Sequence, residues 1–141
     1  MSSDNKKSIN NNILLVDDEY DACLVYKIVL EENGFKVDSF EDPLLALPSF
    51  KPHSYALAIL DIKMPKMSGF ELYREIRKID PEVKVCFLTA SKMYHEDYRK
   101  NEVAVGGAGG EDIAALDKAL FLLKPISNQG LIQQVNKIMN C

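Results

Sequence analysis

The sequence of 141 residues is poor in cysteine and has no motif that would join its thiols or bind a metal through them. Its three cysteines are Cys23, Cys86 and Cys141, an odd number with no C-x-x-C spacing. This pattern argues against a disulfide framework and a zinc site, and it favours a reducing compartment such as the cytoplasm. Cys23 lies in a helical pattern and Cys86 in an apolar strand pattern, so we expect both to be thiols of the core.

The sequence also lacks long apolar runs and an excess of basic residues. No apolar run approaches the roughly 18 residues that cross a bilayer, and the polar start, MSSDNKK, has no signal-peptide core. Lys and Arg number 17 against 21 Asp and Glu, which gives a formal net charge of −4. We therefore expect a cytoplasmic protein that contacts no membrane and binds no nucleic acid directly.

Strand patterns alternate with helical patterns along most of the chain. Short apolar runs predict buried strands at 13–16, 36–40, 55–60, 83–88 and 119–123. Amphipathic patterns with capping signals predict helices at 20–32, 43–50, 69–79 and 127–139. The first helical pattern places Leu24, Val25, Ile28 and Val29 on one face. Such an alternation predicts a parallel sheet with helices on both faces.

Two segments do not fit this alternation. Residues 1–12 are polar, so we expect a flexible tail. From Thr89 to Lys124 the chain spans 35 residues (124 − 89), more than the roughly 20 that one helix and two connections need, which indicates an insertion within about 95–118. Its glycines at 105–110 favour a loop over a phosphate cradle, because they do not satisfy G-x-G-x-x-G. A short extra helix at 112–120 stays open.

Acidic residues gather where the predicted strands end. In an open parallel sheet, chemistry lies at the carboxyl ends of the strands, and here Asp17, Asp18 and Asp61 occupy such positions. Taken singly, Asp17, Asp18 and Glu19 could simply cap the helix that follows, since acids favour its amino end. If the first and third strands are neighbours, however, the three aspartate carboxylates converge, and two such charges 4 Å apart repel by about 4 kcal/mol at an effective dielectric of 20. This corner must protonate one acid or bind a cation, and its oxygen ligands suit Mg²⁺.

The same sheet edge predicts a site for phosphoryl transfer. A cation would neutralise an incoming phosphoryl group, which makes Asp61 a candidate nucleophile that forms an acyl phosphate. Lys124, after the fifth strand, could hold one phosphoryl oxygen as a point charge. The hydroxyl of Thr89, after the fourth strand, could donate to another.

Four segments in order carry a family resemblance: ILLVDDE at 13–19, LDIKMPKMSG at 60–69, FLTA at 87–90 and FLLKP at 121–125. Together they resemble the receiver domain of two-component response regulators, the CheY-like family, from residue 13 to about 139. The resemblance implies a flavodoxin-like, doubly wound α/β fold with a five-stranded parallel sheet in the order 2-1-3-4-5. It also implies one receiver domain over 13–141 with no output domain.

The resemblance implies roles for individual residues. Asp61 would be the phospho-acceptor, and Mg²⁺ would be held by Asp17, Asp18, Asp61 and the backbone carbonyl of Lys63. Lys124 matches the phosphate-binding lysine of the family.

Thr89 and Phe121 match the family's switch pair. Because Phe121 carries no hydroxyl, the tyrosine hydrogen bond of some relatives is not available to it. The alternative for Phe121 is an ordinary core aromatic of a strand.

The function that the resemblance implies is a phosphorylation-dependent switch. A sensor histidine kinase, a phosphotransfer protein or a small phosphodonor supplies the phosphoryl group, and the domain catalyses its own phosphorylation and dephosphorylation without being an enzyme for a separate substrate. We expect a monomer or a phosphorylation-dependent dimer, and we expect the insertion to alter the choice of output partner.

Two other functions compete with this switch. One is a pseudo-receiver that acts as a phosphorylation-independent interaction module. The other is a Mg²⁺-dependent phosphohydrolase of the haloacid dehalogenase type. Those enzymes carry D-x-D after the first strand, and Asp17-Asp18-Glu19 lacks that spacing.

Overall fold

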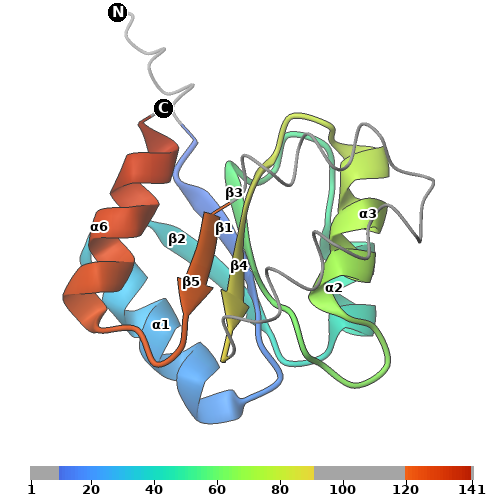
Figure 1. Cartoon of the computed structure of the whole chain (residues 1–141). Helices are drawn as coiled ribbons and strands as arrows, with labels where there is room; N and C mark the ends of the chain where they lie inside the picture. Colours follow the sequence, from blue (N-terminus) through green and yellow to red (C-terminus); the bar gives the residue numbers. More distant parts are fainter. Residues whose placement is uncertain (1–9, 91–119, 141) are drawn as a thin grey trace, which may run out of the picture.

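The computed structural model describes residues 10–90 and 120–140, which form a parallel sheet covered by helices on both faces (Figure 1). The strands are β1 (Asn12–Val16), β2 (Lys36–Phe40), β3 (Leu57–Asp61), β4 (Lys84–Thr89) and β5 (Leu120–Leu123). They lie in the order β2-β1-β3-β4-β5, and every pairing is parallel. The predicted sheet order and the doubly wound architecture are confirmed.

The helices among the described residues are α1 (Tyr20–Glu32), α2 (Pro43–Ser49), α3 (Gly69–Ile79) and α6 (Asn128–Met139). Helices α1 and α6 cover one face of the sheet, and α2 and α3 cover the other (Figure 1). Among these helices, none is long and apolar enough to span a bilayer.

Side-chain caps explain where α2, α3 and α6 begin. The Asp42 carboxylate accepts a hydrogen bond from the Leu44 N–H, and the Ser127 hydroxyl accepts one from the Gly130 N–H. At α3, Ser68 and its Glu71 partner form a reciprocal capping box. These bonds satisfy N–H groups that a helix start otherwise leaves without a partner.

The central strands are buried on both faces, which is why they read as continuous apolar runs. In β1, Ile13 and Leu15 pack with α1 and α6, whereas Leu14 and Val16 pack with α2 and α3. The thiols of Cys23 and Cys86 are buried and free, as predicted. Burial raises the pKa of both thiols, so both are weakly nucleophilic core groups.

The predicted packing face of α1 is wrong for most of its residues. Val29 is buried, but Leu24, Val25 and Ile28 are 41%, 45% and 46% exposed. The side chains that face the sheet are those of Cys23, Tyr26, Val29 and Leu30. Helix α1 carries apolar residues around most of its circumference, so apolar spacing alone does not identify the face that packs.

Some predictions concern residues that the structure does not describe. The insertion at about 95–118 and its glycines at 105–110 lie outside the described residues, as do residues 1–9 of the predicted tail. The possible helix at 112–120 also lies outside them, except for Leu120, which belongs to β5.

Candidate functional site

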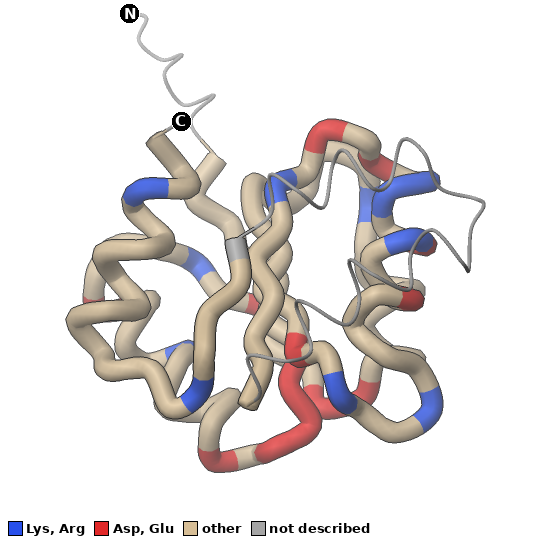
Figure 2. Tube along the Cα trace, viewed as in Figure 1, with Lys and Arg blue, Asp and Glu red and all other residues tan. Residues whose placement is uncertain are grey.

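The carboxyl ends of β1, β3, β4 and β5 surround an open pocket of about 280 Å³. Its charged and polar lining residues are Asp18, Glu19, Asp61, Lys63, Thr89 and Lys124. In Figure 2, an acidic stretch follows β1 at this edge of the sheet. Residues far apart in sequence therefore meet here, as the sheet order predicted.

Three carboxylates crowd one side of the pocket. Asp17, Asp18 and Asp61 each offer an oxygen, and these oxygens lie within 4.8 Å of one another. At an effective dielectric of 20, two unit charges at that distance repel by about 3 kcal/mol. Burial, and after it the negative charge of Asp17, raises the pKa of Asp61 to about 8. The pocket thus disfavours three ionised carboxylates unless a cation joins them.

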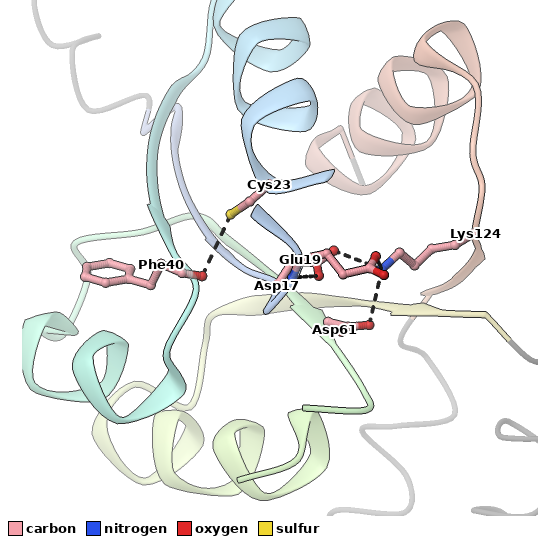
Figure 3. A network of polar contacts seen from close by, with 6 residues as sticks. All are labelled: Asp17, Glu19, Cys23, Phe40, Asp61 and Lys124. Carbon is pink, nitrogen blue, oxygen red and sulfur yellow. Dashed lines mark hydrogen bonds and ion pairs between the residues drawn. The ribbon is translucent and has the colours of Figure 1, made fainter. Parts of the chain in front are cut away.

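Hydrogen bonds from neighbouring strands hold the acidic residues in place. The Phe40 carbonyl at the end of β2 accepts from the Asp17 N–H at 3.1 Å and from the Cys23 thiol at 3.8 Å (Figure 3). The Ile62 N–H, directly after Asp61, donates to the carbonyl of Leu88 at 2.9 Å. The sheet itself therefore fixes the positions of Asp17 and Asp61.

Lys124 brings a positive charge to these acids from the end of β5. Its Nζ lies 2.9 Å from Glu19 Oε1, 3.1 Å from Asp17 Oδ2 and 3.8 Å from Asp61 Oδ1 (Figure 3). Burial lowers the pKa of Lys124, but the hydrogen bonds to Glu19 and Asp17 outweigh it and raise the pKa overall. Lys124 is therefore ionised, but one ammonium cannot neutralise all the surrounding carboxylates.

The donor set fits a hard divalent cation. Three clustered carboxylates, two of which line the open pocket, are the kind of oxygen ligands that Mg²⁺ takes while it keeps several waters. Lys63 lines the same pocket. That its backbone carbonyl binds the metal stays a prediction.

Thr89 and Phe121 lie on one face of the sheet. Thr89 ends β4 and is buried at the pocket, and its carbonyl accepts from the Lys124 N–H at 2.7 Å. Phe121 pairs with Phe87 in the β4–β5 register, and their ring centroids are 5.3 Å apart. Because alternate strand residues share a face, Thr89 points to the same side as Phe87. Phe121 is thus a partly buried aromatic within reach of changes at Thr89.

Two residues that shape this site, Gly69 and Glu19, had no predicted part in its chemistry, and Glu19 was expected only as a possible cap of the helix that follows. A Cβ on Gly69 would lie 2.4 Å from the Asp61 carbonyl oxygen, so the start of α3 approaches the Asp61 backbone as only glycine allows. Glu19 makes the shortest ion pair of Lys124. A glycine directly after the Ser68 helix cap was the available signal for the first, whereas no sequence signal pointed to the second.

Comparison with known proteins agrees with this geometry. A family model described as the response regulator receiver domain matches residues 13–136. Since this match spans most of the chain, the protein belongs to the response regulator receiver domain family of two-component signalling. The predicted family is confirmed.

Individual relatives match this chain over most of its length. The chain is 29% identical over 131 residues to the chemotaxis protein CheY of Bacillus subtilis, covering 92% of this chain and 98% of CheY. It is 26% identical over 127 residues to the transcriptional regulatory protein RprY of Bacteroides fragilis, covering 90% of this chain and 48% of RprY. The response regulator TrrA of Thermotoga maritima, solved in complex with Mg²⁺ and BeF, superposes with a TM-score of 0.67 and 31% identity, covering 91% and 98% of the two chains.

Proposed function

We propose that this protein is a phosphorylation-dependent signalling switch in which Asp61 accepts a phosphoryl group and Mg²⁺ is the cofactor. The observation that carries the proposal is the meeting of three carboxylates and a partly buried ammonium at one open pocket of the sheet edge. Membership of the receiver family supports it, as does the complex of the relative TrrA with Mg²⁺ and BeF.

The proposed reaction needs few protein groups. The P–N bond of a phosphohistidine, or the P–O bond of an acyl phosphate, breaks as an Asp61 oxygen bonds to phosphorus, and the leaving group keeps the electron pair. Asp17, Asp18, Asp61 and the Lys63 carbonyl would hold Mg²⁺, which when bound offsets the charge of the phosphoryl oxygens. Lys124, whose Nζ is 3.8 Å from Asp61 Oδ1, then binds a phosphoryl oxygen. The domain catalyses this step on itself and on no separate substrate.

The signal would leave the site through Thr89 and Phe121. A phosphoryl oxygen on Asp61 accepts a hydrogen bond from the Thr89 hydroxyl, and the Phe121 ring repacks against its neighbour Phe87. Phosphorylation shifts the two states only by its differential interaction with them, and a change from 1:99 to 99:1 needs about 5.5 kcal/mol. The output partner binds whichever surface this repacking alters.

An exposed apolar stripe on α1 supports a helical protein as phosphodonor. We define the α1 stripe as Tyr20, Leu24, Val25 and Ile28, which are 59%, 41%, 45% and 46% exposed. It begins at the residue after Glu19, at the mouth of the pocket, and its members recur at helical spacing. A sensor histidine kinase or phosphotransfer protein that packed a helix along this stripe would bring its phosphohistidine toward Asp61. The free thiols of Cys23 and Cys86 are consistent with the cytoplasm as the place of this encounter.

Intact mass tests the phosphorylation. The protein is incubated with acetyl phosphate and Mg²⁺, and the measurement is repeated with chelator, with Asp61→Asn and with Asp21→Asn as a matched control on the exposed start of α1. We expect one phosphoryl adduct in the wild type and in Asp21→Asn, and none with chelator or in Asp61→Asn. An adduct that survives Asp61→Asn would contradict the assignment of Asp61. A wild type without adduct would favour the alternative, a phosphorylation-independent pseudo-receiver.

A further inference from the structure

Glu19 has no part in the phosphoryl transfer proposed above, yet among the described residues it makes the shortest ion pair of Lys124, at 2.9 Å. It occupies the N-cap position of α1, where side chains commonly accept a hydrogen bond from the helix start. The Glu19 side chain makes no such bond. It extends instead to Lys124, 105 residues away in sequence (Figure 3).

The hydrogen bonds of Asp17 indicate why the contact between Glu19 and Lys124 matters for cation binding. Asp17 Oδ1 accepts from the Glu19 N–H at 3.0 Å, and Asp17 Oδ2 accepts from Lys124 Nζ at 3.1 Å. Both oxygens of a buried member of the carboxylate cluster are therefore engaged. A cation that approaches Asp17 meets the like charge of Lys124, so the ammonium has to leave Oδ2 before that oxygen can serve as a ligand.

We propose that Glu19 is a positioning residue for the Mg²⁺ site: it is the carboxylate to which Lys124 withdraws when the cation takes Asp17. An ammonium has three N–H donors on a flexible stem, so it can keep its bond to Glu19 while it releases Asp17. The Lys124 side chain is only 13% exposed, and water alone would not replace the lost acceptor well. Glu19 thereby keeps Lys124 close to Asp61, where the proposed function requires it.

Glu19 could also favour Mg²⁺ binding simply through its negative charge, because any acid near the pocket attracts a divalent cation. Asp21 provides the matched control for this effect of charge. Asp21 is an exposed acid in the first turn of the same helix, whereas the ion pairs of Lys124 with described residues join it to Asp17, Glu19 and Asp61. Replacing Asp21 removes one nearby charge and leaves the bond between Glu19 and Lys124 intact.

The test is a titration of the full chain with Mg²⁺, followed by amide shifts in ¹H–¹⁵N NMR spectra. It compares the wild type with Glu19→Gln, Asp21→Asn, Lys124→Met and the double variant Glu19→Gln/Lys124→Met. We expect Glu19→Gln to weaken Mg²⁺ binding about three- to fivefold beyond Asp21→Asn, the range of a partly exposed ion pair. In the Lys124→Met background this extra loss should vanish, because Glu19 then has no ammonium to hold.

Two results would overturn the inference: equal Mg²⁺ affinity in Glu19→Gln and Asp21→Asn, or an undiminished effect of Glu19→Gln when Lys124 is methionine. The inference rests on the proposed function, so the same samples are also treated with acetyl phosphate and weighed. A wild type that binds Mg²⁺ but gains no phosphoryl group refutes the proposed function, and the titration still decides the role of Glu19. A wild type that is phosphorylated while Glu19→Gln matches Asp21→Asn refutes the role of Glu19 alone. A wild type that binds no Mg²⁺ refutes both.

Discussion

Asp61→Asn should stabilise the fold at neutral and alkaline pH, although Asp61 is the centre of the proposed function. Asp61 is 5% exposed, and burial, followed by the charge of Asp17, raises its pKa from the ordinary 3.8 to about 8. Between these two values the folded state binds a proton that the unfolded state has lost. Stability therefore falls as pH rises through this window, and the full penalty of an ionised Asp61 is present above it. Asparagine carries no charge, so the variant escapes this penalty.

The size of the gain follows from the shift in pKa. One unit corresponds to 1.36 kcal/mol, so the shift of Asp61 sets a ceiling of about 6 kcal/mol. Because the pocket is open to water, screening reduces this value. We expect a gain of about 2 kcal/mol at a pH near 8.5 that shrinks toward zero as the pH falls to about 4.

Urea denaturation followed by circular dichroism, with chelator present, measures this gain across the pH range. Asp80→Asn is the matched control, because Asp80 is also buried but accepts hydrogen bonds from the N–H groups of His53 and Glu82, each at 3.0 Å. An amide cannot accept both bonds in the same way, so this variant should lose about 1–3 kcal/mol. The reasoning is refuted if Asp61→Asn is less stable than the wild type at high pH, or if its gain is the same at pH 5 and pH 8.5.

Two further substitutions test the close approach of α3 to Asp61 and the role of the α1 stripe. Gly69→Ala should lower the free energy of unfolding by about 1–3 kcal/mol, because the methyl group would lie 2.4 Å from the Asp61 carbonyl oxygen. In Gly130→Ala the methyl would meet the Ser127 hydroxyl, which can move; an equal loss of stability in both would contradict the argument. Ile28→Asp should reduce the rate of transfer from a phosphohistidine donor relative to the rate with acetyl phosphate, about tenfold or more at an apolar contact centre. Leu45→Asp on α2, where Leu45 is 64% exposed, is its control, and an unchanged ratio for Ile28→Asp would exclude the α1 stripe as the donor surface.

The sheet could be predicted because its strands are buried on both faces, which leaves a continuous apolar signal. The ends of the strands were less certain. The prediction began the third strand at residue 55, whereas β3 spans Leu57–Asp61. Tyr55 is buried, but it lies in the preceding connection, with its hydroxyl donating to Asp38 at 2.6 Å. A buried aromatic residue in a connection has the same apolar character as a strand residue, so the sequence pattern included Tyr55 in the strand.

The face of α1 could not be predicted for a different reason. Apolar side chains that pack on the sheet and apolar side chains that stay exposed look the same in a sequence. Cys23 and Leu30 belong to the first group, and Leu24 and Ile28 belong to the second. The rotation of α1 about its own axis on the sheet, which the sequence pattern does not give, separates the two groups.

The meeting of the acids followed from topology, but their contacts did not. The carboxyl ends of parallel strands meet at one edge of the sheet, so the sequence predicted that Asp17, Asp61 and Lys124 lie close together. Which carboxylate Lys124 contacts most closely depends on the direction of side chains from positions 105 and 107 residues away. At an N-cap, spacing favours a local bond to the helix, and Glu19 does not make one.

In the proposed function, the burial that makes an ionised Asp61 costly to the fold would also strengthen the effect of a phosphoryl group on that residue. A unit charge about 4 Å from an ammonium interacts by about 4 kcal/mol at an effective dielectric of 20, but by only about 1 kcal/mol in water. Reversing the populations of two states needs about 5.5 kcal/mol. A phosphoryl group carries nearly two negative charges. Its attraction to the ammonium therefore approaches 5.5 kcal/mol in the partly buried site, where each charge contributes about 4 kcal/mol, but not in water. Lys124 is 13% exposed and is also bonded through its N–H to the carbonyl of Thr89. Lys124 therefore combines an ammonium beside Asp61 with a backbone bond that joins the ends of β4 and β5.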